Sequence, residues 1–302
     1  MSFPRFVSAG EALTDFIRID TDKWVSRAGG APWNVSRAMA TLGIPSAFAG
    51  CVSEDRFGDE LCELSSRAGL DSRFMQRADR PPLLAIVHET SPPQYFFVGA
   101  QSADLDFEPA QLPRDWIDHV EWVHCGGISL AREPLASNLV NMLNALRHAG
   151  KHISFDPNIR NVMGAAYLDT FHHIAALAAL IKVSDEDLRG LFPNDKEEAA
   201  LAKLRTLNAR APILLTRGAK GAELYVDERS FKQSAPRLDV IDTVGAGDAS
   251  IGGFLFSLMT YPQNTWPEHL RFSVAAAGAA CLAPGAAPPS LARVSQVLST
   301  MQ

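Results

Sequence analysis

Short apolar runs alternate with longer segments of helical periodicity along most of the chain. The runs indicate strands within 5–13, 14–20, 45–53, 122–130, 152–160, 180–184 and 211–225, the last with a turn inside it. The segments between them repeat apolar residues every three or four positions, which predicts helices within 27–44, 55–70, 134–149, 167–180, 196–208, 241–258 and 270–283. This alternation favours a parallel sheet with helices on both faces.

One region departs from this alternation. Between residues 70 and 107 the stretches PPLLAIVHET and PQYFFVGAQ are joined by SPP, which is the pattern of two antiparallel strands. A further loosely alternating stretch lies within about 12–28. We expect these strands to form a small separate sheet attached to a single domain, 1–302.

Composition narrows the class of function. The 302 residues are 47% hydrophobic and 21% charged with a net charge of −6, which is typical of a globular protein and offers no basic face for nucleic acid. The chain has no long apolar run and no signal-peptide core, so we expect a cytoplasmic protein without a membrane partner. The four cysteines are scattered without a CxxC pair, which does not favour a zinc site.

The most informative stretch is DTVGAGD, residues 242–248, at the start of an apolar helical pattern. Glycines let backbone amides approach an anion closely, and a helix N-terminus carries partial positive charge that suits phosphate. Asp248 lies beside these amides and has the chemistry to take a proton from an attacking hydroxyl. The alternative is a plain N-cap, in which the carboxylate stabilises the helix by about 1 kcal/mol. Neither GxxxxGK[ST] nor GxGxxG occurs.

Extended to DTVGAGDASIGGFLFSL, this stretch resembles the C-terminal signature of the ribokinase-like (PfkB) carbohydrate kinases. Residues 29–61 resemble the N-terminal signature, and GEALTDF, FDPNIR, KVSDEDL and TRGAKGAELY also fit, so the likeness extends over nearly the whole chain. The pattern is most similar to fructokinases, with aminoimidazole riboside kinase close behind. The resemblance implies an α/β protein with a three-layer α/β/α arrangement, a central mostly parallel sheet and a small β-sheet lid over the sugar. It also implies ATP and Mg²⁺ as cofactors, K⁺ as a further candidate, and a homodimer formed through the lid.

The resemblance also implies roles for individual residues. Asp248 would be the catalytic base, beside an anion hole at Gly245, Ala246 and Gly247, with Arg160 reaching phosphate or substrate. The implied substrate-binding residues are Asp15, Gly29, Gly30, Asn34, Phe97 and Asp248. The implied ATP-binding residues are Ser184, Thr216, Gly218, Gly221, Gly245, Gly247 and Gly278. Asp187 would act indirectly on Mg²⁺, and a monovalent cation would lie at Asp242, Ala283 and Gly285.

Each of these roles has a structural alternative. Asp15 has the alternative of a solvated loop acid, Arg160 that of a salt bridge, and Gly218 and Gly221 that of a hairpin turn. Gly29, Gly30 and Asn34 have the alternative of a turn followed by a helix cap, and small residues such as Gly278 that of core packing.

Several positions depart from the family pattern. Ser184 replaces the Asn of an Asn-x-x-Glu motif, and either Glu186 or Asp187 takes the acidic role. Gly99 stands near the place of a lid arginine, which weakens the case for an acidic sugar. We further expect Trp33 to narrow the pocket, Arg217 to add a phosphate contact and Ser250 to loosen the packing behind the catalytic turn.

The sequence therefore predicts an ATP-dependent sugar kinase that phosphorylates a primary hydroxyl, with fructose as the leading substrate. The alternatives are an aminoimidazole riboside or other nucleoside kinase, a 2-keto-3-deoxygluconate kinase, and a non-catalytic sugar-binding regulator of the same fold.

Overall fold

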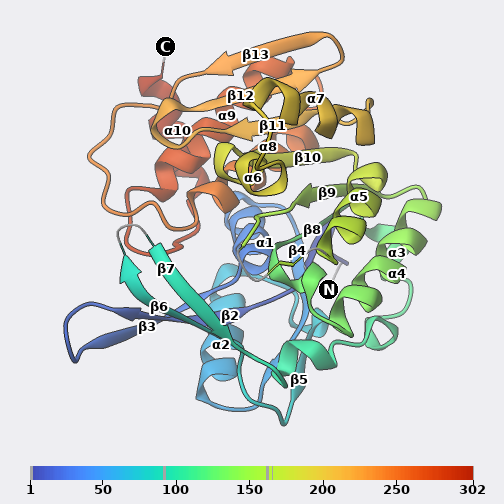
Figure 1. The fold of residues 1–302 in the computed structure, drawn as a ribbon, viewed down its shortest axis with the longest axis vertical. Helices are drawn as coiled ribbons and strands as arrows, with labels where there is room; N and C mark the ends of the chain where they lie inside the picture. The colour runs from blue at the N-terminus through green and yellow to red at the C-terminus, as the bar shows by residue number, and fades with distance from the viewer. Residues whose placement is uncertain (1–2, 91–92, 161–162, 165, 302) are drawn as a thin grey trace.

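A nine-stranded sheet with helices on both faces forms the body of the molecule (Figure 1). The computed structural model describes residues 3–90, 93–160, 163–164 and 166–301. The strand order is β13-β12-β11-β10-β9-β8-β1-β4-β5. The strands are β1 Phe6–Ala9, β4 Ser46–Ser53, β5 Met75–Ala78, β8 Trp122–Gly126, β9 His152–Asp156, β10 Leu180–Ser184, β11 Ile213–Thr216, β12 Ala222–Val226 and β13 Arg229–Gln233. Pairing is parallel from β11 to β5 and antiparallel at β12 and β13.

The two faces of the sheet carry separate cores. Successive strand residues point to opposite faces, so that Phe6 and Val7 belong to different apolar clusters. One face is covered by α1 Ala31–Leu42, α8 Ala246–Thr260, α9 Trp266–Ala280 and α10 Leu291–Thr300. The other is covered by α4 Leu135–His148, α5 Tyr167–Leu177, α6 Asp185–Leu191 and α7 Glu197–Leu207, with the short α3 Trp116–His119 beside them. The helix α2 Arg56–Ala68 packs with α1 and β4 in a smaller cluster.

A second sheet of four strands projects from the body, at the lower left of Figure 1. Its order is β3-β2-β6-β7, with β2 Leu13–Arg18, β3 Trp24–Gly29, β6 Leu84–Thr90 and β7 Pro93–Val98. Leu13, Leu83 and Ala85 bury their side chains against Ile128 of the body, so one face of this sheet is closed by the main domain. The predicted antiparallel pair and separate sheet are confirmed, and β7 is an edge strand.

Some elements differ from the prediction. The run at 122–130 is a strand only to Gly126, where a 3-10 turn, Gly127–Ala131, begins. The helix predicted over 167–180 ends at Leu177, because Leu180 already belongs to β10. The strand β3 overlaps the predicted stretch 12–28, and β13 was not predicted. The assignment of 70–107 to the small sheet is wrong for β5, which pairs with β4 at the edge of the nine-stranded sheet.

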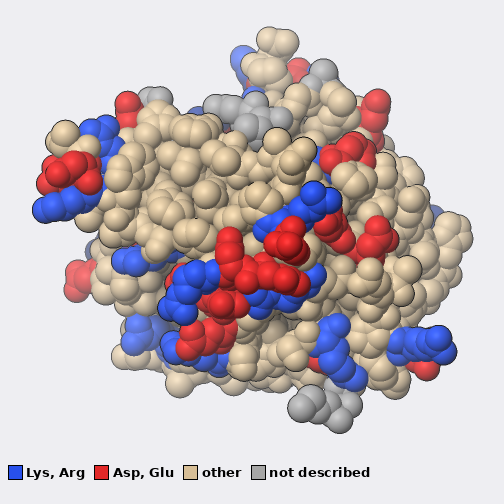
Figure 2. Space-filling model, turned by 90° about the horizontal axis from the view of Figure 1, so that it is seen from below, with Lys and Arg blue, Asp and Glu red and all other residues tan. Residues whose placement is uncertain are grey.

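Surface charge is mixed. Acidic and basic side chains lie side by side on the face shown in Figure 2, so this face offers no field of one sign to steer a polyanion. Within the described parts of the chain, no helix is both long and apolar enough to cross a bilayer.

Candidate active site

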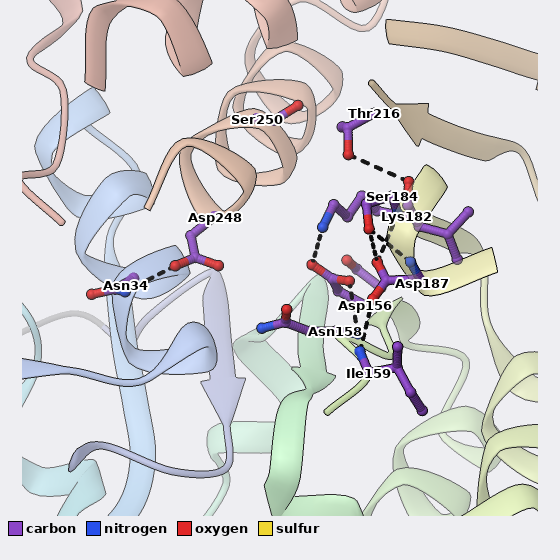
Figure 3. A network of polar contacts seen from close by, with 12 residues as sticks. Asn34, Asp156, Asn158, Ile159, Lys182, Ser184, Asp187, Thr216, Asp248 and Ser250 are labelled. Atoms are coloured by element: carbon purple, nitrogen blue, oxygen red, sulfur yellow. Dashed lines mark hydrogen bonds and ion pairs between the residues drawn. The ribbon is translucent and has the colours of Figure 1, made fainter. Parts of the chain in front are cut away.

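Asp248 lies in the first turn of α8 and faces α1. Its Oδ2 accepts a hydrogen bond of 2.8 Å from Nδ2 of Asn34, and Figure 3 shows the two side chains pointing toward each other. The N-cap of α8 is Gly245, with no side chain bonded to the helix start. The N-cap alternative for Asp248 is therefore wrong, since Asp248 comes after the N-cap residue and its carboxylate bonds Asn34.

The backbone before Asp248 forms a turn that only glycine fits well. Gly245 has a φ of 78°, and a Cβ there would lie 2.9 Å from Cβ of Ala286. The amide of Ala246 donates to the carbonyl of Thr243 at 3.2 Å. Among the described residues no acceptor bonds the amides of Gly245, Gly247 and Asp248, so these three remain available to an anion, whereas the amide of Ala246 is already engaged.

The electrostatic surroundings suit Asp248 to act as a base. Burial raises the pKa of its carboxyl, while the hydrogen bond from Asn34 and the positive charges of Lys182 and Arg160 oppose this rise. A carboxylate with a raised pKa binds a proton more readily than a solvated aspartate does, which suits a general base.

A second polar group lies across from Asp248, at the ends of β9 and β10 (Figure 3). Asp187 Oδ2 accepts bonds from the amide and Oγ of Ser184, both at 2.7 Å, and its Oδ1 accepts from the amide of Ile159 at 2.7 Å. Asp187 is buried, whereas Glu186 is exposed. Of the two acids left open by the sequence, Asp187 is thus the one that ties the FDPNIR loop to β10.

Lys182 and Asp156 form a buried ion pair that the sequence analysis did not single out. The Nζ–Oδ2 distance is 2.8 Å, and the side chains are 6% and 3% exposed. Burial raises the pKa of Asp156 to about 6 against the opposing charge of Lys182. The signal was present in LIKVS, because a lysine inside an otherwise apolar buried strand needs a partner.

The predicted sugar residues gather between the small sheet and the body. A Cβ at Gly29 would collide with the carboxylate of Asp15, so the two are in direct contact. Burial and the charge of Asp248 raise the pKa of Asp15 to about 6, and Arg160 opposes the rise. Asp15 is thus not a solvated loop acid. Asn34 is at the start of α1, where its amide bonds the carbonyl of Gly30, and Phe97 packs on the Leu13 cluster.

Comparison with known proteins identifies the family of the chain. The profile of the pfkB family carbohydrate kinases matches residues 4–293. The chain belongs to this family. The fructokinase of Escherichia coli is 30% identical over 274 residues, 87% of each protein. Aminoimidazole riboside kinase of Salmonella typhimurium is 31% identical over 278 residues, 90% of this chain and 86% of that protein. The crystal structure of fructokinase with bound ATP from Xylella fastidiosa has a TM-score of 0.89 at 26% identity and covers 98% of both chains.

The fold is thus ribokinase-like, and the chain is an ATP-dependent carbohydrate kinase. In this kinase the residues predicted for ATP have different surroundings from one another. Thr216 ends β11, and a side chain at Gly218 would meet open space. Gly221 has a φ of 95° and its Cβ would collide with the carbonyl of Gln233, so the hairpin itself requires glycine there. A Cβ at Gly278 would lie 2.9 Å from Pro236, which indicates close packing at that helix position.

The structure shows the contacts of four of the family departures, and two of them, Trp33 and Arg217, differ from the prediction. Trp33 is wholly buried and donates from Nε1 to Oγ of Ser65 at 2.8 Å, so it packs α1 on α2 and does not narrow the pocket. Arg217 is paired with Glu197 at 2.6 Å and with Glu223 at 3.3 Å, which leaves the predicted phosphate contact without support.

The other two departures concern packing. Ser250 is buried and bonds Ser273 of α9 at 2.9 Å, so the serine pair joins the two helices where loosened packing was expected. Gly99 has an arginine beside it, since Arg132 donates to its carbonyl at 2.6 Å. Arg132 is also paired with Asp104 at 3.1 Å. A side chain at Gly99 would collide with Leu83.

Glu11 gives a prediction about stability. It follows β1, is 3% exposed and accepts bonds from the amide and Oγ of Ser129. Burial raises its pKa from 4.5 to about 7. A carboxyl with a raised pKa in the folded state stabilises the fold at low pH and loses this contribution as the pH rises through 7. Wild type should therefore lose about 2 kcal/mol of unfolding free energy between about pH 5 and pH 8 through this group.

The Glu11→Gln variant should lack this loss, so that its advantage over wild type grows with pH. Chemical denaturation of both proteins at about pH 5 and pH 8 measures this difference in unfolding free energy. Glu228→Gln, which changes an almost fully exposed side chain, serves as the control and should show no such growth. An equal Glu11→Gln effect at both pH values would contradict the raised pKa.

Proposed function

We propose that this kinase transfers the γ-phosphoryl group of ATP to a primary hydroxyl of a small ketose, with fructose as the first candidate. The observation that carries the proposal is the position of Asp248. Its carboxylate lies between the free amides at the start of α8 and the predicted sugar residues Asn34 and Asp15. The names of the two curated relatives support a sugar or a riboside as acceptor.

In this mechanism Asp248 takes the proton of the sugar hydroxyl as its oxygen attacks the γ-phosphorus. The amides of Gly245 and Gly247 donate to the charge on the transferring group, and Arg160 supplies a positive charge near both carboxylates. Asp15 accepts from sugar hydroxyls. The small sheet closes over the sugar and excludes water, which limits hydrolysis of ATP.

The proposed cofactors are MgATP and K⁺. Within the described residues no three His, Cys, Asp or Glu side chains gather to hold a metal, which fits a Mg²⁺ bound chiefly by phosphates and water. Asp187, whose two oxygens are bonded, acts on it only through the position of the loop. When bound with ATP, Mg²⁺ would supply positive charge that neutralises the phosphates. For K⁺, Asp242 Oδ2 accepts a hydrogen bond of 2.8 Å from the amide of Gly285, so this carboxylate lies beside the segment that carries the carbonyls of Ala283 and Gly285.

The exposed apolar residues of the lid support a further proposal, a dimer. Phe96 and Val98 on edge strand β7 are 50% and 49% exposed, and Trp24 on edge strand β3 is 42% exposed, which supports a homodimer through this sheet.

The pocket itself is acidic, with Asp15 and Asp248 near one another, and Arg132 is already paired with Asp104. This disfavours the acidic 2-keto-3-deoxygluconate. We place the enzyme in the cytoplasm, where ATP and free sugars are available.

The test is release of ADP with ATP, Mg²⁺ and K⁺ across fructose, ribose, adenosine, aminoimidazole riboside and 2-keto-3-deoxygluconate. We expect kcat/KM for fructose to exceed that for the other acceptors by at least about tenfold, which corresponds to 1.4 kcal/mol of discrimination. A preference for aminoimidazole riboside would show that the proposed substrate is wrong, while the proposed mechanism would stand. Calorimetric binding of a sugar without any turnover would instead identify a non-catalytic regulator.

A further inference from the structure

A buried ammonium group lies next to the start of α8. Lys182 is 4% exposed, and Asp156 at 2.8 Å is the single hydrogen-bond partner that its Nζ has among the described residues. A lysine ammonium has three donors, so two of them are unused. Figure 3 shows the side chain extending from β10 toward the same space that Asp248 faces from α8.

Stability alone does not explain this ion pair. Burying two charges costs desolvation energy, and well-packed apolar side chains of similar volume stabilise a fold equally well or better. The neighbours of Lys182 on the strand, Ile181 and Val183, are apolar and fully buried. A charged lysine in this strand therefore calls for a role in the site.

The geometry directs the ammonium at the anion hole. A Cβ built on Gly247 would lie 3.4 Å from Nζ and 3.9 Å from Cε of Lys182. Because Gly247 has no side chain, nothing of that residue fills the space between the ammonium and the first turn. The unbonded amides of Gly247 and Asp248 lie in the same turn.

The charges around Lys182 keep its amine protonated. Asp156, Asp187 and Asp248 raise the pKa of its amine against the effect of burial. His124, whose Nδ1 lies 2.9 Å from Oγ of Ser154, is neutral because burial and the charge of Lys182 lower its pKa to about 3. No second cation therefore comes from this histidine.

We propose that Lys182 is a catalytic residue whose ammonium, held by Asp156, donates to a non-bridging oxygen of the transferring γ-phosphoryl group. This rests on the proposed function. In the step, the bond from the γ-phosphorus to the bridging oxygen of ADP breaks, and a bond to the sugar oxygen forms. The hydroxyl proton passes to Asp248, and Lys182 keeps its own proton, so its contribution is electrostatic.

The test uses the double variant Lys182→Met/Asp156→Asn. The single Lys182→Met variant would leave Asp156 buried without a partner, which threatens folding, whereas the double variant removes both charges with little change in volume. The matched control is Arg132→Met/Asp104→Asn, which removes a partly buried ion pair on other elements, with side chains 18% and 1% exposed. Thermal unfolding establishes that both variants fold.

Two measurements separate a catalytic role from a structural one. We expect kcat of the double variant to fall by about 10²- to 10³-fold, the effect of removing one donor to a developing charge. By calorimetry in the presence of sugar, affinity for the non-hydrolysable ATP analogue AMP-PNP should fall at least about tenfold while ADP affinity stays within about threefold, because only the γ-phosphoryl group meets the ammonium. The control should leave the ratio of the two affinities unchanged.

The opposite results overturn the proposal. A double variant with kcat within about threefold of wild type, or with equal losses of AMP-PNP and ADP affinity, would show that the pair is structural. A wild type that binds neither nucleotide would overturn the proposed function itself, and the role of Lys182 with it.

Discussion

The Asp248→Asn variant is expected to lose roughly a thousandfold in kcat, within the range for removal of a general base. The amide retains the shape of the side chain and its contact with Asn34 but cannot accept the hydroxyl proton. Binding of sugar and ATP should change little. Because burial raises the pKa of Asp248, the ionised carboxylate costs folding free energy at neutral pH, so the variant should unfold at the same or a higher temperature.

Asp55 provides the matched control. Its Oδ1 accepts from the amides of Phe57 and Gly58 at 2.9 and 3.1 Å, so it is a true N-cap of α2. Asp55→Ala should lose about 1 kcal/mol of stability and keep its kcat. Asp248→Asn should thus lose kcat without losing thermal stability, whereas Asp55→Ala should lose thermal stability without losing kcat. An Asp248→Asn enzyme with more than about a tenth of wild-type kcat would contradict the role of base.

The pH dependence of kcat follows from the same carboxyl. Only the ionised form accepts a proton, so kcat should fall as the pH drops through the raised pKa of Asp248. This acidic limb should lie above the usual range of an aspartate and should be absent from the residual activity of Asp248→Asn.

The catalytic turn was predictable because its chemistry is local in sequence. DTVGAGD places the glycines, the helix start and the acid within seven consecutive residues, so the turn and the position of Asp248 follow from dihedral preferences and helix polarity. The alternation of apolar runs and helical segments similarly predicts the layered sheet. The edge strand β3 was covered only by the loosely alternating stretch 12–28, because its last residue alone is buried and the strand gives no clear period.

The residues that the sequence misplaced depend on partners far along the chain. Arg217 had the chemistry for phosphate, but its distance from Glu197 and Glu223 is set by the packing of α7 on the sheet edge. Trp33 was expected to narrow the pocket as a departure from the family pattern, yet adjacent residues of a helix face about 100° apart, and Trp33 faces α2. Lys182 and Asp156 meet only because β9 and β10 are neighbours in a parallel sheet.

The start of α8 combines two requirements that conflict in an ordinary helix. Glycine at position 247 lowers helix propensity by about 1 kcal/mol relative to alanine, and a buried acid one residue later adds a desolvation cost. Both free-energy costs occur at the place where the amides, the ammonium group and the carboxylate face the same space. The helix start thus departs from ordinary helix propensity and from the burial of apolar residues at the place where the transferring phosphoryl group needs hydrogen-bond donors and the attacking hydroxyl needs a base.

Gly247→Val is therefore expected to lower kcat by roughly a thousandfold while the fold stays intact. Position 247 has ordinary helical geometry, and valine has a higher helix propensity than glycine, so unfolding should occur at an equal or higher temperature. The two added methyl groups would occupy the space between the first-turn amides and Nζ of Lys182, where the phosphoryl group is to be held. ATP affinity should fall with kcat, since the bound γ-phosphate needs the same space.

Gly247→Ala is the matched control for this space. Its Cβ would lie 3.4 Å from Nζ of Lys182, an ordinary contact distance, so alanine should cost no more than about tenfold in kcat. A graded loss from glycine to alanine to valine, measured as kcat and as AMP-PNP affinity by calorimetry, would agree with a phosphoryl group seated against this turn. Equal activity of all three enzymes would instead place the transferring group away from the start of α8.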